Sequence, residues 1–421
     1  MDKFIIKGGK KLEGKVTVSG AKNSALVLMP AALLNTGINH ISNTPEVNDI
    51  YTMIKLLKHL GVNSDFSEHN LILDTSNITN LIAPYDHVKK MRASVYVLGP
   101  LLARYGSAKV SLPGGCAWGP RPINLHLEAM KKLGAEIVLE EGYIIAKSSR
   151  LHGAKIHFDV SSVGATGNAL MAAVLAKGTS VISNASIEPE IVLLTDFLTA
   201  MGAKIRGRGT TTLEVDGVDD LVPSSVKNIS DRIEAGTLLT AAAITRSKIE
   251  IVYGEIDNIE SELFKLESSG VKIFRNNEII EIDARDSSIK NVDVTTAVFP
   301  GFPTDMQAQW TAFMTLSDGT STITDTIYHD RFSHVPELNR LGANIEILNN
   351  SAIVKGVKEL KGAKVMSTDL RASASLVLAG LAAHGITEVL RIYHLDRGYQ
   401  RIEEKLRSLG ADIERVNTPE Y

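Results

Sequence analysis

Hydrophobic and polar positions along the chain follow a pattern that recurs six times. In each repeat a helix-like segment ends at a glycine, and a short stretch of alternating polar and apolar residues follows, as in Ala343 to Ile347. A glycine after the last apolar residue is typical of a left-handed helix C-cap, and alternation is typical of a half-buried strand. The glycines are Gly61, Gly134, Gly202, Gly270, Gly342 and Gly410, separated by 73, 68, 68, 72 and 68 residues. The pattern predicts six repeats in which a helix leads directly into a strand.

Each repeat also has a second helix-like segment, which is apolar on most of its faces. It begins with small or polar residues that suit an N-cap and continues with runs such as Ala25 to Met29 or Leu376 to Ala379. Because almost no polar face remains, these helices are expected to be buried. Their starts lie at residues 19–24, 92–94, 162–166, 231–236, 304–307 and 369–373. The other helix of each repeat is expected to begin at Asp49, Arg121, Glu190, Asn258, Arg331 or Arg397.

Six repeats group most simply into two domains of three repeats each. Turn-forming residues cluster at 221–225, between the third and fourth repeats, so a boundary is expected near 226–229. The first strand, Phe4 to Ile6, precedes the first repeat and is able to complete the second domain, in which case the chain crosses between the domains twice. The expected domains are residues 22–229, and residues 1–21 together with 230–421.

Composition limits the class of protein further. The 421 residues are 44% hydrophobic and 22% charged, the formal net charge is −3, and there is one cysteine, Cys116. These values are typical of globular proteins and argue against collagen, coiled coils and disorder. The even charge balance, without long basic runs, predicts binding to neither nucleic acid nor an anionic membrane surface. A single cysteine cannot form an intrachain disulfide, and the chain starts without a long apolar signal segment, which together favour the cytoplasm.

Basic side chains recur at or near the predicted helix starts. They are Lys22, Arg92, Arg121, Arg232, Arg331, Arg371 and Arg397. Helix N-termini bind phosphates and carboxylates, so the repeats are expected to gather positive charge in one cleft between the domains, for a substrate with several anionic groups. The alternative is that each arginine pairs with an acid beside it, as Asp330-Arg331 and Asp396-Arg397 allow. Equivalent placement in successive repeats favours the substrate interpretation.

Two further residues have the chemistry of a catalyst. Cys116 lies among the glycines and prolines of residues 112–122, which indicate a loop. An exposed thiol near Arg121 would have a lowered pKa and can act as a nucleophile or proton donor, whereas a lone cysteine is otherwise an ordinary buried apolar residue. Asp305 follows a turn rich in proline at a helix start, where it is either an N-cap or a general base. No motif for a metal ion or a nucleotide-binding loop is evident in the sequence.

Several ordered motifs resemble those of the UDP-N-acetylglucosamine 1-carboxyvinyltransferase family of enolpyruvyl transferases, along essentially the whole chain. They are Ser19-Gly20-Ala21-Lys22-Asn23, Pro113-Gly114-Gly115-Cys116-Ala117, Arg121-Pro122, Ser162-Val163-Gly164-Ala165-Thr166, Pro300-Gly301-Phe302-Pro303-Thr304-Asp305, Asp369-Leu370-Arg371-Ala372-Ser373 and Asp396-Arg397-Gly398-Tyr399. The resemblance implies an α/β fold, the two-domain inside-out α/β barrel of six β-α-β-α-β-β repeats. It also implies transfer of the enolpyruvyl group of phosphoenolpyruvate to the 3-hydroxyl of UDP-N-acetylglucosamine, which releases phosphate and begins peptidoglycan synthesis. It implies no metal or organic cofactor.

The resemblance further implies roles for the candidate residues. The phosphate of phosphoenolpyruvate would contact Lys22, Arg121 and Arg397, its carboxylate would face Arg331 and Arg371, and Asn23 would lie beside it. Asp305 would take the proton from the sugar hydroxyl. Cys116 would give a proton to C3 of phosphoenolpyruvate and would be alkylated by the epoxide fosfomycin. The contacts to UDP-N-acetylglucosamine would be Asn23, Arg92, Arg121, Pro122, Ile123, Asn124, Leu125, Ser162, Val163, Gly164, Asp305 and Ile327.

The sequence departs from the family pattern at three positions. Asn124 stands where the motif usually has Asp, which predicts an altered contact with uracil, and Trp118 and Pro120 stand where aliphatic and small residues are more common. Two alternatives remain open: a 5-enolpyruvylshikimate-3-phosphate synthase, and a catalytically weak paralogue that binds UDP-sugars and regulates. The expected partners are the two small-molecule substrates, with no nucleic acid or membrane, and the chain is expected to be a monomer or a weak oligomer.

Overall fold

The computed structural model describes residues 2–89, 91–112 and 123–417. Contacts between residues divide the chain into two compact units. The N-terminal unit is Gly20–Ile229, and the C-terminal unit joins Met1–Ser19 to Ser230–Tyr421. The chain therefore passes from one unit to the other twice. Each unit has its own hydrophobic core.

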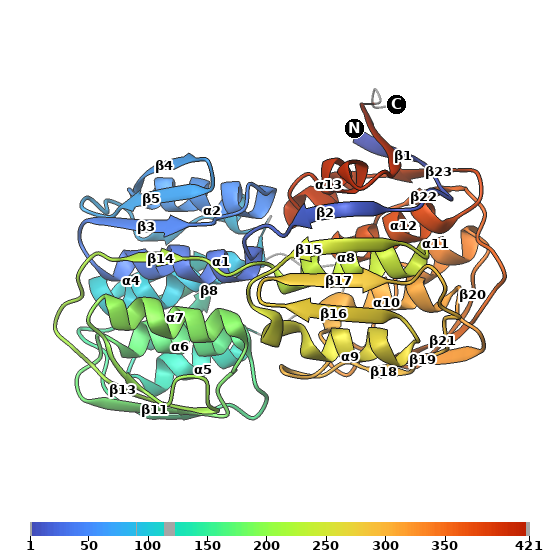
Figure 1. The fold of residues 1–421 in the computed structure, drawn as a ribbon. Helices are drawn as coiled ribbons and strands as arrows, with labels where there is room; N and C mark the ends of the chain where they lie inside the picture. The colour runs from blue at the N-terminus through green and yellow to red at the C-terminus, as the bar shows by residue number, and fades with distance from the viewer. Residues whose placement is uncertain (1, 90, 113–122, 418–421) are drawn as a thin grey trace. The chain divides into compact units, whose positions relative to one another are not determined.

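Within the described ranges, each unit has three four-stranded sheets of one shared topology, in which the first two strands are parallel and the other pairings antiparallel. In the N-terminal unit they are β14 (Ser225–Lys227), β3 (Ile38–Ser42), β5 (Asn70–Asp74), β4 (Asn63–Ser67); β6 (Ile82–Ala83), β7 (Ser107–Ser111), β9 (Tyr143–Lys147), β8 (Glu136–Glu140); and β10 (Lys155–His157), β11 (Thr179–Ser183), β13 (Thr212–Asp216), β12 (Lys204–Arg206). In the C-terminal unit they are β2 (Glu13–Thr17), β15 (Lys248–Val252), β17 (Ile279–Asp283), β16 (Lys272–Asn276); β18 (Val294–Thr295), β19 (Thr320–Thr324), β21 (Ser351–Lys355), β20 (Asn344–Leu348); and β22 (Lys364–Met366), β23 (Ile386–Leu390), β1 (Asp2–Lys7), β24 (Asp412–Asn417). The first of these, with β2, β15, β17 and β16 side by side, faces the viewer in Figure 1. The six predicted repeats are confirmed as six copies of one sheet.

Two strands complete their units from distant parts of the chain. Strand β1 lies between β23 and β24, where Phe4 pairs with Val389 on one side and Arg415 on the other. Strand β14 ends the N-terminal unit and pairs with β3, the first strand of that unit. Phe4 and Ile6 are fully buried, so the first residues of the chain belong to the core of the C-terminal unit.

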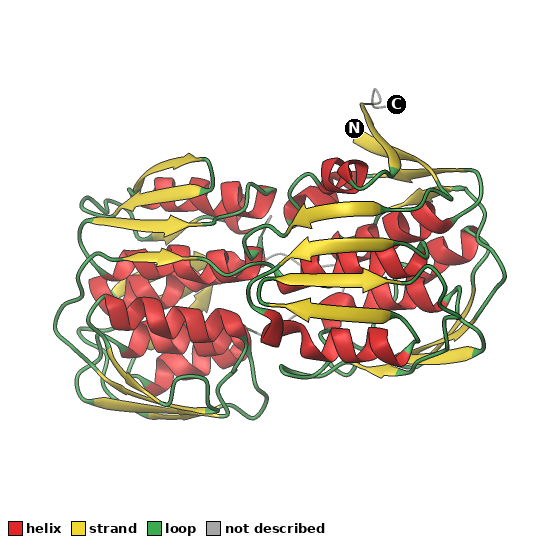
Figure 2. Cartoon of the chain, viewed as in Figure 1, coloured by secondary structure: helices red, strands yellow, loops and turns green. Residues whose placement is uncertain are grey.

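The sheets pack over helices in each unit, as Figure 2 shows for the front sheet of the C-terminal unit. The inner helices are largely buried, as their apolar sequences predict; they are α1 (Lys22–Ala31), α4 (Leu98–Tyr105), α6 (Val163–Ala173), α8 (Arg232–Ile244), α10 (Gln307–Met314) and α12 (Leu370–Ala382). The outer helices are α2 (Asn48–Leu60), α5 (Asn124–Lys132), α7 (Pro189–Ala200), α9 (Glu260–Ser268), α11 (Val335–Arg340) and α13 (Ile402–Ser408). Shorter pieces are α3 (Tyr85–Val88) and the 3₁₀ helices η1 (Ala32–Leu34), η2 (Arg92–Val97), η3 (Ile256–Ile259), η4 (Thr304–Met306) and η5 (Ile392–Arg397).

The repeated glycines end the outer helices, as predicted. All six have positive φ, from 91° at Gly342 to 109° at Gly61. Strands β4, β8, β12, β16, β20 and β24 follow them. A left-handed residue turns the chain out of the helix axis, and glycine takes that conformation without a Cβ clash.

Three of the predicted helix starts are wrong. Helix α5 begins at Asn124 rather than at Arg121. Helix α11 begins at Val335 rather than at Arg331, because Pro336 fits only the first turn of a helix. Helix α13 begins at Ile402 rather than at Arg397, because Arg401 has a left-handed φ of 43° that separates η5 from α13. Arg331 and Arg397 therefore lie in the segments that precede α11 and α13.

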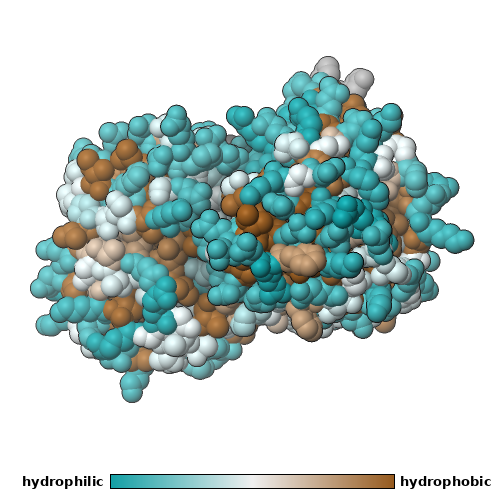
Figure 3. Space-filling view, in the orientation of Figure 1, coloured by the Kyte–Doolittle hydropathy of each residue, from teal (hydrophilic) through white to brown (hydrophobic). Residues whose placement is uncertain are grey.

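The described residues contain no helix with both the length and the apolar character needed to span a bilayer. Hydrophilic side chains cover much of the face shown in Figure 3, with apolar side chains between them. On the outer elements of the C-terminal unit, Phe264 of α9 and Phe274 of β16 are more than half exposed.

Candidate active site

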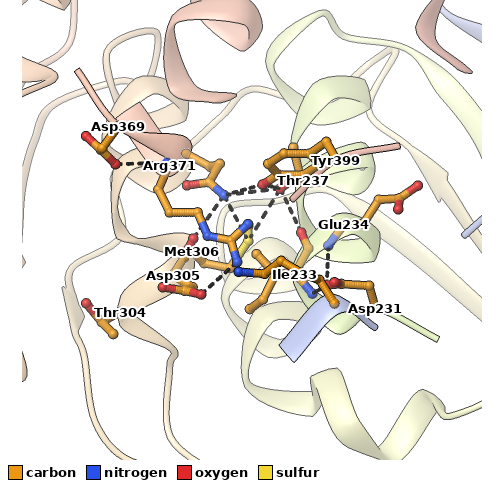
Figure 4. Close-up of polar contacts among 12 residues, drawn as sticks. Asp231, Ile233, Glu234, Thr237, Thr304, Asp305, Met306, Asp369, Arg371 and Tyr399 are labelled. Atoms are coloured by element: carbon orange, nitrogen blue, oxygen red, sulfur yellow. Dashed lines mark hydrogen bonds and ion pairs between the residues drawn. The ribbon is translucent and has the colours of Figure 1, made fainter. Parts of the chain in front are cut away.

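Asp305 lies in η4, directly before the inner helix α10. Its Oδ1 is 2.8 Å from Arg331 Nη1, and its Oδ2 accepts a hydrogen bond of 2.7 Å from Arg371 Nη2. The arginine side chains are only 8% and 4% exposed, whereas that of Asp305 is 25% exposed. Figure 4 shows Asp305 and Arg371 pointing toward each other. Two buried guanidinium groups thus orient a carboxylate that still reaches solvent.

Arg371 is held by the start of its own helix, α12. The N-cap Asp369 accepts the backbone N–H groups of Arg371 at 2.9 Å and of Ala372 at 3.2 Å. The guanidinium group lies 5.4 Å from the centre of the Tyr399 ring. Burial lowers the pKa of Arg371, but the negative charges around it, chiefly that of Asp305, outweigh burial and raise the pKa overall. The predicted capping role of Asp369 is confirmed, and Arg371 is a charged partner for Asp305.

A buried network ties these residues to helix α8 (Figure 4). The Tyr399 hydroxyl is 2.9 Å from Thr237 Oγ1 and accepts a hydrogen bond of 3.2 Å from Gln309 Nε2. Gln309 Nε2 also donates to the backbone carbonyl of Asp305 at 3.0 Å. Sequence inspection missed Thr237 and Gln309, because single polar residues on largely apolar helices form no motif. Burial raises the pKa of Tyr399, which leaves its hydroxyl neutral as a donor and acceptor in this network.

Arg397 is the last residue of η5 and is partly buried. The residue before it, Asp396, accepts two hydrogen bonds from Arg415 of β24, at 2.6 and 3.0 Å. Arg415 also donates to the buried Glu403 at 2.7 Å. The acid beside Arg397 is thus engaged by a different arginine, which holds the end of η5 against the sheet.

In the N-terminal unit, Lys22 is the first residue of the inner helix α1. Its side chain is nearly buried, and Nζ lies 3.4 Å from Asp49 Oδ2 of α2. Asn23 follows and is partly buried. The structure therefore has a buried cation at a helix start, where the sequence pattern predicts one.

Three more helix starts of this unit hold predicted residues. Arg92 begins η2, Asn124 begins α5 and is exposed, and Ser162 is the N-cap of α6, where its Oγ accepts from Ala165 N at 3.3 Å. Their neighbours Ile123, Leu125, Val163 and Gly164 are partly buried. A Cβ on Gly164 would lie 3.0 Å from His126 Nε2, so glycine lets the backbone of α6 approach the histidine.

Asn168 of α6 contacts residues near the other two helix starts, and no sequence pattern indicated this role. Its Nδ2 donates to the Val95 carbonyl at 2.9 Å and lies 3.0 Å from His126 Nδ1, while its Oδ1 accepts from Gly99 N at 2.7 Å. Burial, with a smaller effect of the Arg92 charge, lowers the pKa of His126 from 6.5 to about 4. His126 is therefore a neutral side chain that packs η2, α5 and α6 together.

The predicted site residues thus divide between the units. The C-terminal unit brings Asp305, Arg331 and Arg371 into direct contact. It also holds Arg397 and the partly exposed Ile327. Cys116, Trp118, Pro120, Arg121 and Pro122 lie outside the described residues.

Comparison with protein families matches residues 6–406 to the EPSP synthase (3-phosphoshikimate 1-carboxyvinyltransferase) family. Among curated relatives, the chain is 58% identical to the UDP-N-acetylglucosamine 1-carboxyvinyltransferase of Chloroherpeton thalassium, with 100% of this chain and 99% of the relative covered. It is 57% identical to the protein of the same name from Chlorobium limicola, with both chains covered completely.

Solved structures show a similar fold over nearly the whole chain. The enolpyruvyl transferase NikO from Streptomyces tendae is 25% identical, has a TM-score of 0.90, and is covered to 99%, as is this chain. The EPSP synthase of Acinetobacter baumannii is 18% identical, with a TM-score of 0.76 over 99% of this chain and 100% of the other.

Proposed function

Because this chain belongs to the EPSP synthase family of enolpyruvyl transferases, we propose that it transfers the enolpyruvyl group of phosphoenolpyruvate to the 3-hydroxyl of UDP-N-acetylglucosamine. Phosphate leaves in this reaction, and the product enters peptidoglycan synthesis. Full-length identity above one half to relatives named UDP-N-acetylglucosamine 1-carboxyvinyltransferase supports this acceptor over shikimate 3-phosphate. The observation that carries the chemistry is the Asp305 carboxylate, oriented by two buried arginines.

Asp305 acts as the general base in this proposal. A base must lie within hydrogen-bond reach of the proton that it takes, and its orientation must be held during transfer. The partial exposure of Asp305 leaves its carboxylate accessible to a sugar hydroxyl, while Arg331 and Arg371 each hold one of its oxygens. The hydroxyl oxygen then attacks C2 of phosphoenolpyruvate as its proton moves to Asp305.

The same arginines bind the carboxylate of phosphoenolpyruvate. A guanidinium group has five N–H donors in a fixed fork, so Arg331 and Arg371 are able to contact a second carboxylate beside Asp305. The phosphate group is assigned to Lys22, Arg121 and Arg397. Lys22 is supported by its position at the first turn of α1, where the helix dipole also favours an anion.

The helix starts of the N-terminal unit bind the uridine diphosphate part of the acceptor. The residues assigned to it are Arg92, Arg121, Pro122, Ile123, Asn124, Leu125, Ser162, Val163 and Gly164, while Asn23, Asp305 and Ile327 are assigned to the sugar. The support is that these residues lie at the starts of η2, α5 and α6, since backbone N–H groups at a helix start suit anionic oxygens. Asn124 offers a donor as well as an acceptor, so we expect a contact with uracil different from that of an aspartate.

Cys116 is assigned as the proton donor to C3 of phosphoenolpyruvate, which becomes a methyl group as the sugar oxygen adds to C2. When phosphate then leaves C2, C3 loses a proton and the double bond of the enolpyruvyl group forms again. We further propose that the protein works in the cytoplasm, as a monomer or weak oligomer. A single cysteine in 421 residues supports this location, because proteins of a reducing compartment rarely contain disulfides.

Phosphate release from phosphoenolpyruvate, measured with and without UDP-N-acetylglucosamine, tests the proposal. Release should require the UDP-sugar, and Asp305→Asn should lower the rate by about 10²- to 10⁴-fold, because the amide retains the shape but cannot take the proton. Turnover with shikimate 3-phosphate, and none with UDP-N-acetylglucosamine, would show that the proposed acceptor is wrong. Calorimetric binding of UDP-N-acetylglucosamine with no turnover at high enzyme concentration would indicate a regulatory paralogue.

A further inference from the structure

A second carboxylate, Asp325, lies fully buried directly after β19 in the same repeat as Asp305. It accepts hydrogen bonds from four donors. Oδ2 accepts from Thr304 Oγ1 at 2.6 Å, and Oδ1 accepts from Thr296 Oγ1 at 2.8 Å. Oδ1 also accepts the backbone N–H groups of Ile327 and Tyr328, both at 2.9 Å. A buried carboxylate with this many donors is held firmly and in turn orients the groups that donate to it.

One arm of this arrangement leads to Asp305. Thr304 donates to Asp325 and accepts from Arg331 Nη1 at 3.0 Å. The same Nη1 lies 2.8 Å from Asp305 Oδ1. Asp325, Thr304, Arg331 and Asp305 thus form a continuous chain of polar contacts, in which the Thr304 hydroxyl is the link between the buried and the accessible carboxylate.

The other arm leads to the turn that contains Ile327. The backbone N–H groups of Ile327 and Tyr328, two successive residues of this turn, both donate hydrogen bonds to Oδ1 of Asp325. Ile327 is 37% exposed in this turn, and the Tyr328 ring lies 5.5 Å from the Arg331 guanidinium group. The position of Ile327 therefore depends on the same carboxylate as the position of Asp305.

The other repeats have different residues at this position, so a carboxylate here is not a general requirement of the repeat. The residues directly after the strands equivalent to β19 are Asn43, Leu112, Asn184, Tyr253 and Arg391, and all are described. Asn43 and Asn184 donate to backbone carbonyls of a neighbouring segment, at 2.9 and 2.8 Å. Among these six positions an acid occurs only at Asp325, in the repeat that supplies Asp305.

We propose that Asp325 is a positioning residue for the reaction. It orients Asp305 through Thr304 and Arg331, and it holds the Ile327 turn, so that one buried carboxylate couples the placement of the base to the binding of the sugar. The inference rests on the proposed function, since it assigns Asp305 and Ile327 to the acceptor sugar.

Two substitutions test separately the contacts of Asp325 with Thr304 and its contacts with the Ile327 turn. For each variant, kcat and KM are measured by phosphate release. Thr304→Val removes the hydroxyl that joins Asp325 to Arg331 and leaves the hydrogen bonds from the Ile327 turn to Asp325 in place. The value of kcat should therefore fall about tenfold, while KM for UDP-N-acetylglucosamine stays within about twofold. Asp325→Asn weakens both arms, so kcat should fall similarly and this KM should also rise about fivefold. Asparagine has the shape of aspartate, and its side-chain oxygen can still accept the N–H groups of Ile327 and Tyr328, so the second variant is expected to fold.

Three further proteins make the test specific. Thr304→Ser keeps the hydroxyl and should restore kcat to within about twofold of the wild type. The double variant Asp325→Asn/Thr304→Val should have a kcat no lower than either single variant, because both changes break one chain of contacts. Asp293→Asn is the matched control: Asp293 is exposed, accepts the backbone N–H of Thr322 in β19 at 2.7 Å, and should leave kcat and KM unchanged.

Each result supports or overturns the inference. Unchanged kcat in Thr304→Val, failure of serine to restore it, or strictly additive losses in the double variant would show that Asp325 does not orient Asp305 through Thr304. Equal losses in Asp293→Asn would show that the effect is not specific to Asp325 and would also overturn the inference. Wild-type protein without any turnover in this assay would refute the proposed function, whereas an active wild type with fully active variants would refute only the positioning role.

Discussion

The buried histidine of the N-terminal unit predicts a specific loss of stability in acid. His126 is 7% exposed, and its Nδ1 faces the amide of Asn168 at 3.0 Å. Because that amide nitrogen can only donate, Nδ1 must accept, and a proton on Nδ1 would break the contact. Burial and the charge of Arg92 also oppose the imidazolium form and lower the pKa of His126 to about 4. Protonation is therefore far easier in the unfolded chain than in the native one.

The size and sign of the effect follow from the two pKa values. Between the ordinary pKa of 6.5 and the native value of about 4, the unfolded chain binds a proton that the native chain does not. Unfolding then takes up a proton, so stability falls as the pH falls through this window and this contribution levels off below it. The difference corresponds to about 3 kcal/mol of unfolding free energy lost by pH 4.

Urea unfolding of the full chain between pH 7.5 and pH 4.5 measures this loss. His126→Asn retains an acceptor for Asn168 but cannot titrate, so the wild type should lose about 2 kcal/mol more than this variant over the range. His157→Asn changes an exposed histidine of β10 in the same unit and should follow the wild type. An equally steep loss in His126→Asn, or an NMR titration of the His126 ring near pH 6.5, would refute the reasoning.

Three other predictions concern the interior, the repeated turns and the thiol. Asn168→Leu should lower the free energy of unfolding in urea by about 3 kcal/mol, because the buried Gly99 N–H and Val95 carbonyl lose their partner; wild-type stability would contradict the network. Gly342→Ala should cost about 1 to 2 kcal/mol, since a Cβ there meets nothing within 4 Å and only the left-handed backbone is strained. Gly61→Ala should cost more in the same measurement, because its Cβ would lie 2.6 Å from the Asn77 carbonyl oxygen; equal losses would show that the contact relaxes. Fosfomycin should inactivate the protein by alkylating Cys116, and Cys116→Asp should escape labelling while it keeps activity; equal labelling of both proteins, followed by mass spectrometry, would refute the assignment.

The repeat architecture was predictable from the sequence because its signals are local. A helix that ends with a residue of positive φ favours glycine there, as at Gly410, and the alternation after it follows from the two faces of a strand. Apolar stretches such as that of α12 likewise indicate burial without knowledge of their neighbours. The starts of α11 and α13 differ from the prediction because local features set them: Pro336 suits only a first turn, and Arg401 has a left-handed backbone.

The candidate site was predictable only in part. Asp305, Arg331 and Arg371 were singled out individually, but their mutual ion pairs depend on three segments that are separated in the sequence. Polar residues such as Asn168, Gln309 and Asp325 escaped notice, since a lone amide or acid has no periodicity. Their importance comes from the donors and acceptors that surround them once buried.

The sequence by itself determined the six repeats, the burial of the inner helices and the chemical types of residue at the helix starts, because each depends on neighbours within one or two turns of chain. The tertiary structure alone decided which charges meet. It turned Arg331 and Arg371 toward Asp305, joined Asp325 to that pair through Thr304, and completed the C-terminal unit with β1. The physical reason is that a buried charge or amide must find a partner, and in this fold the partners come from other repeats and other elements.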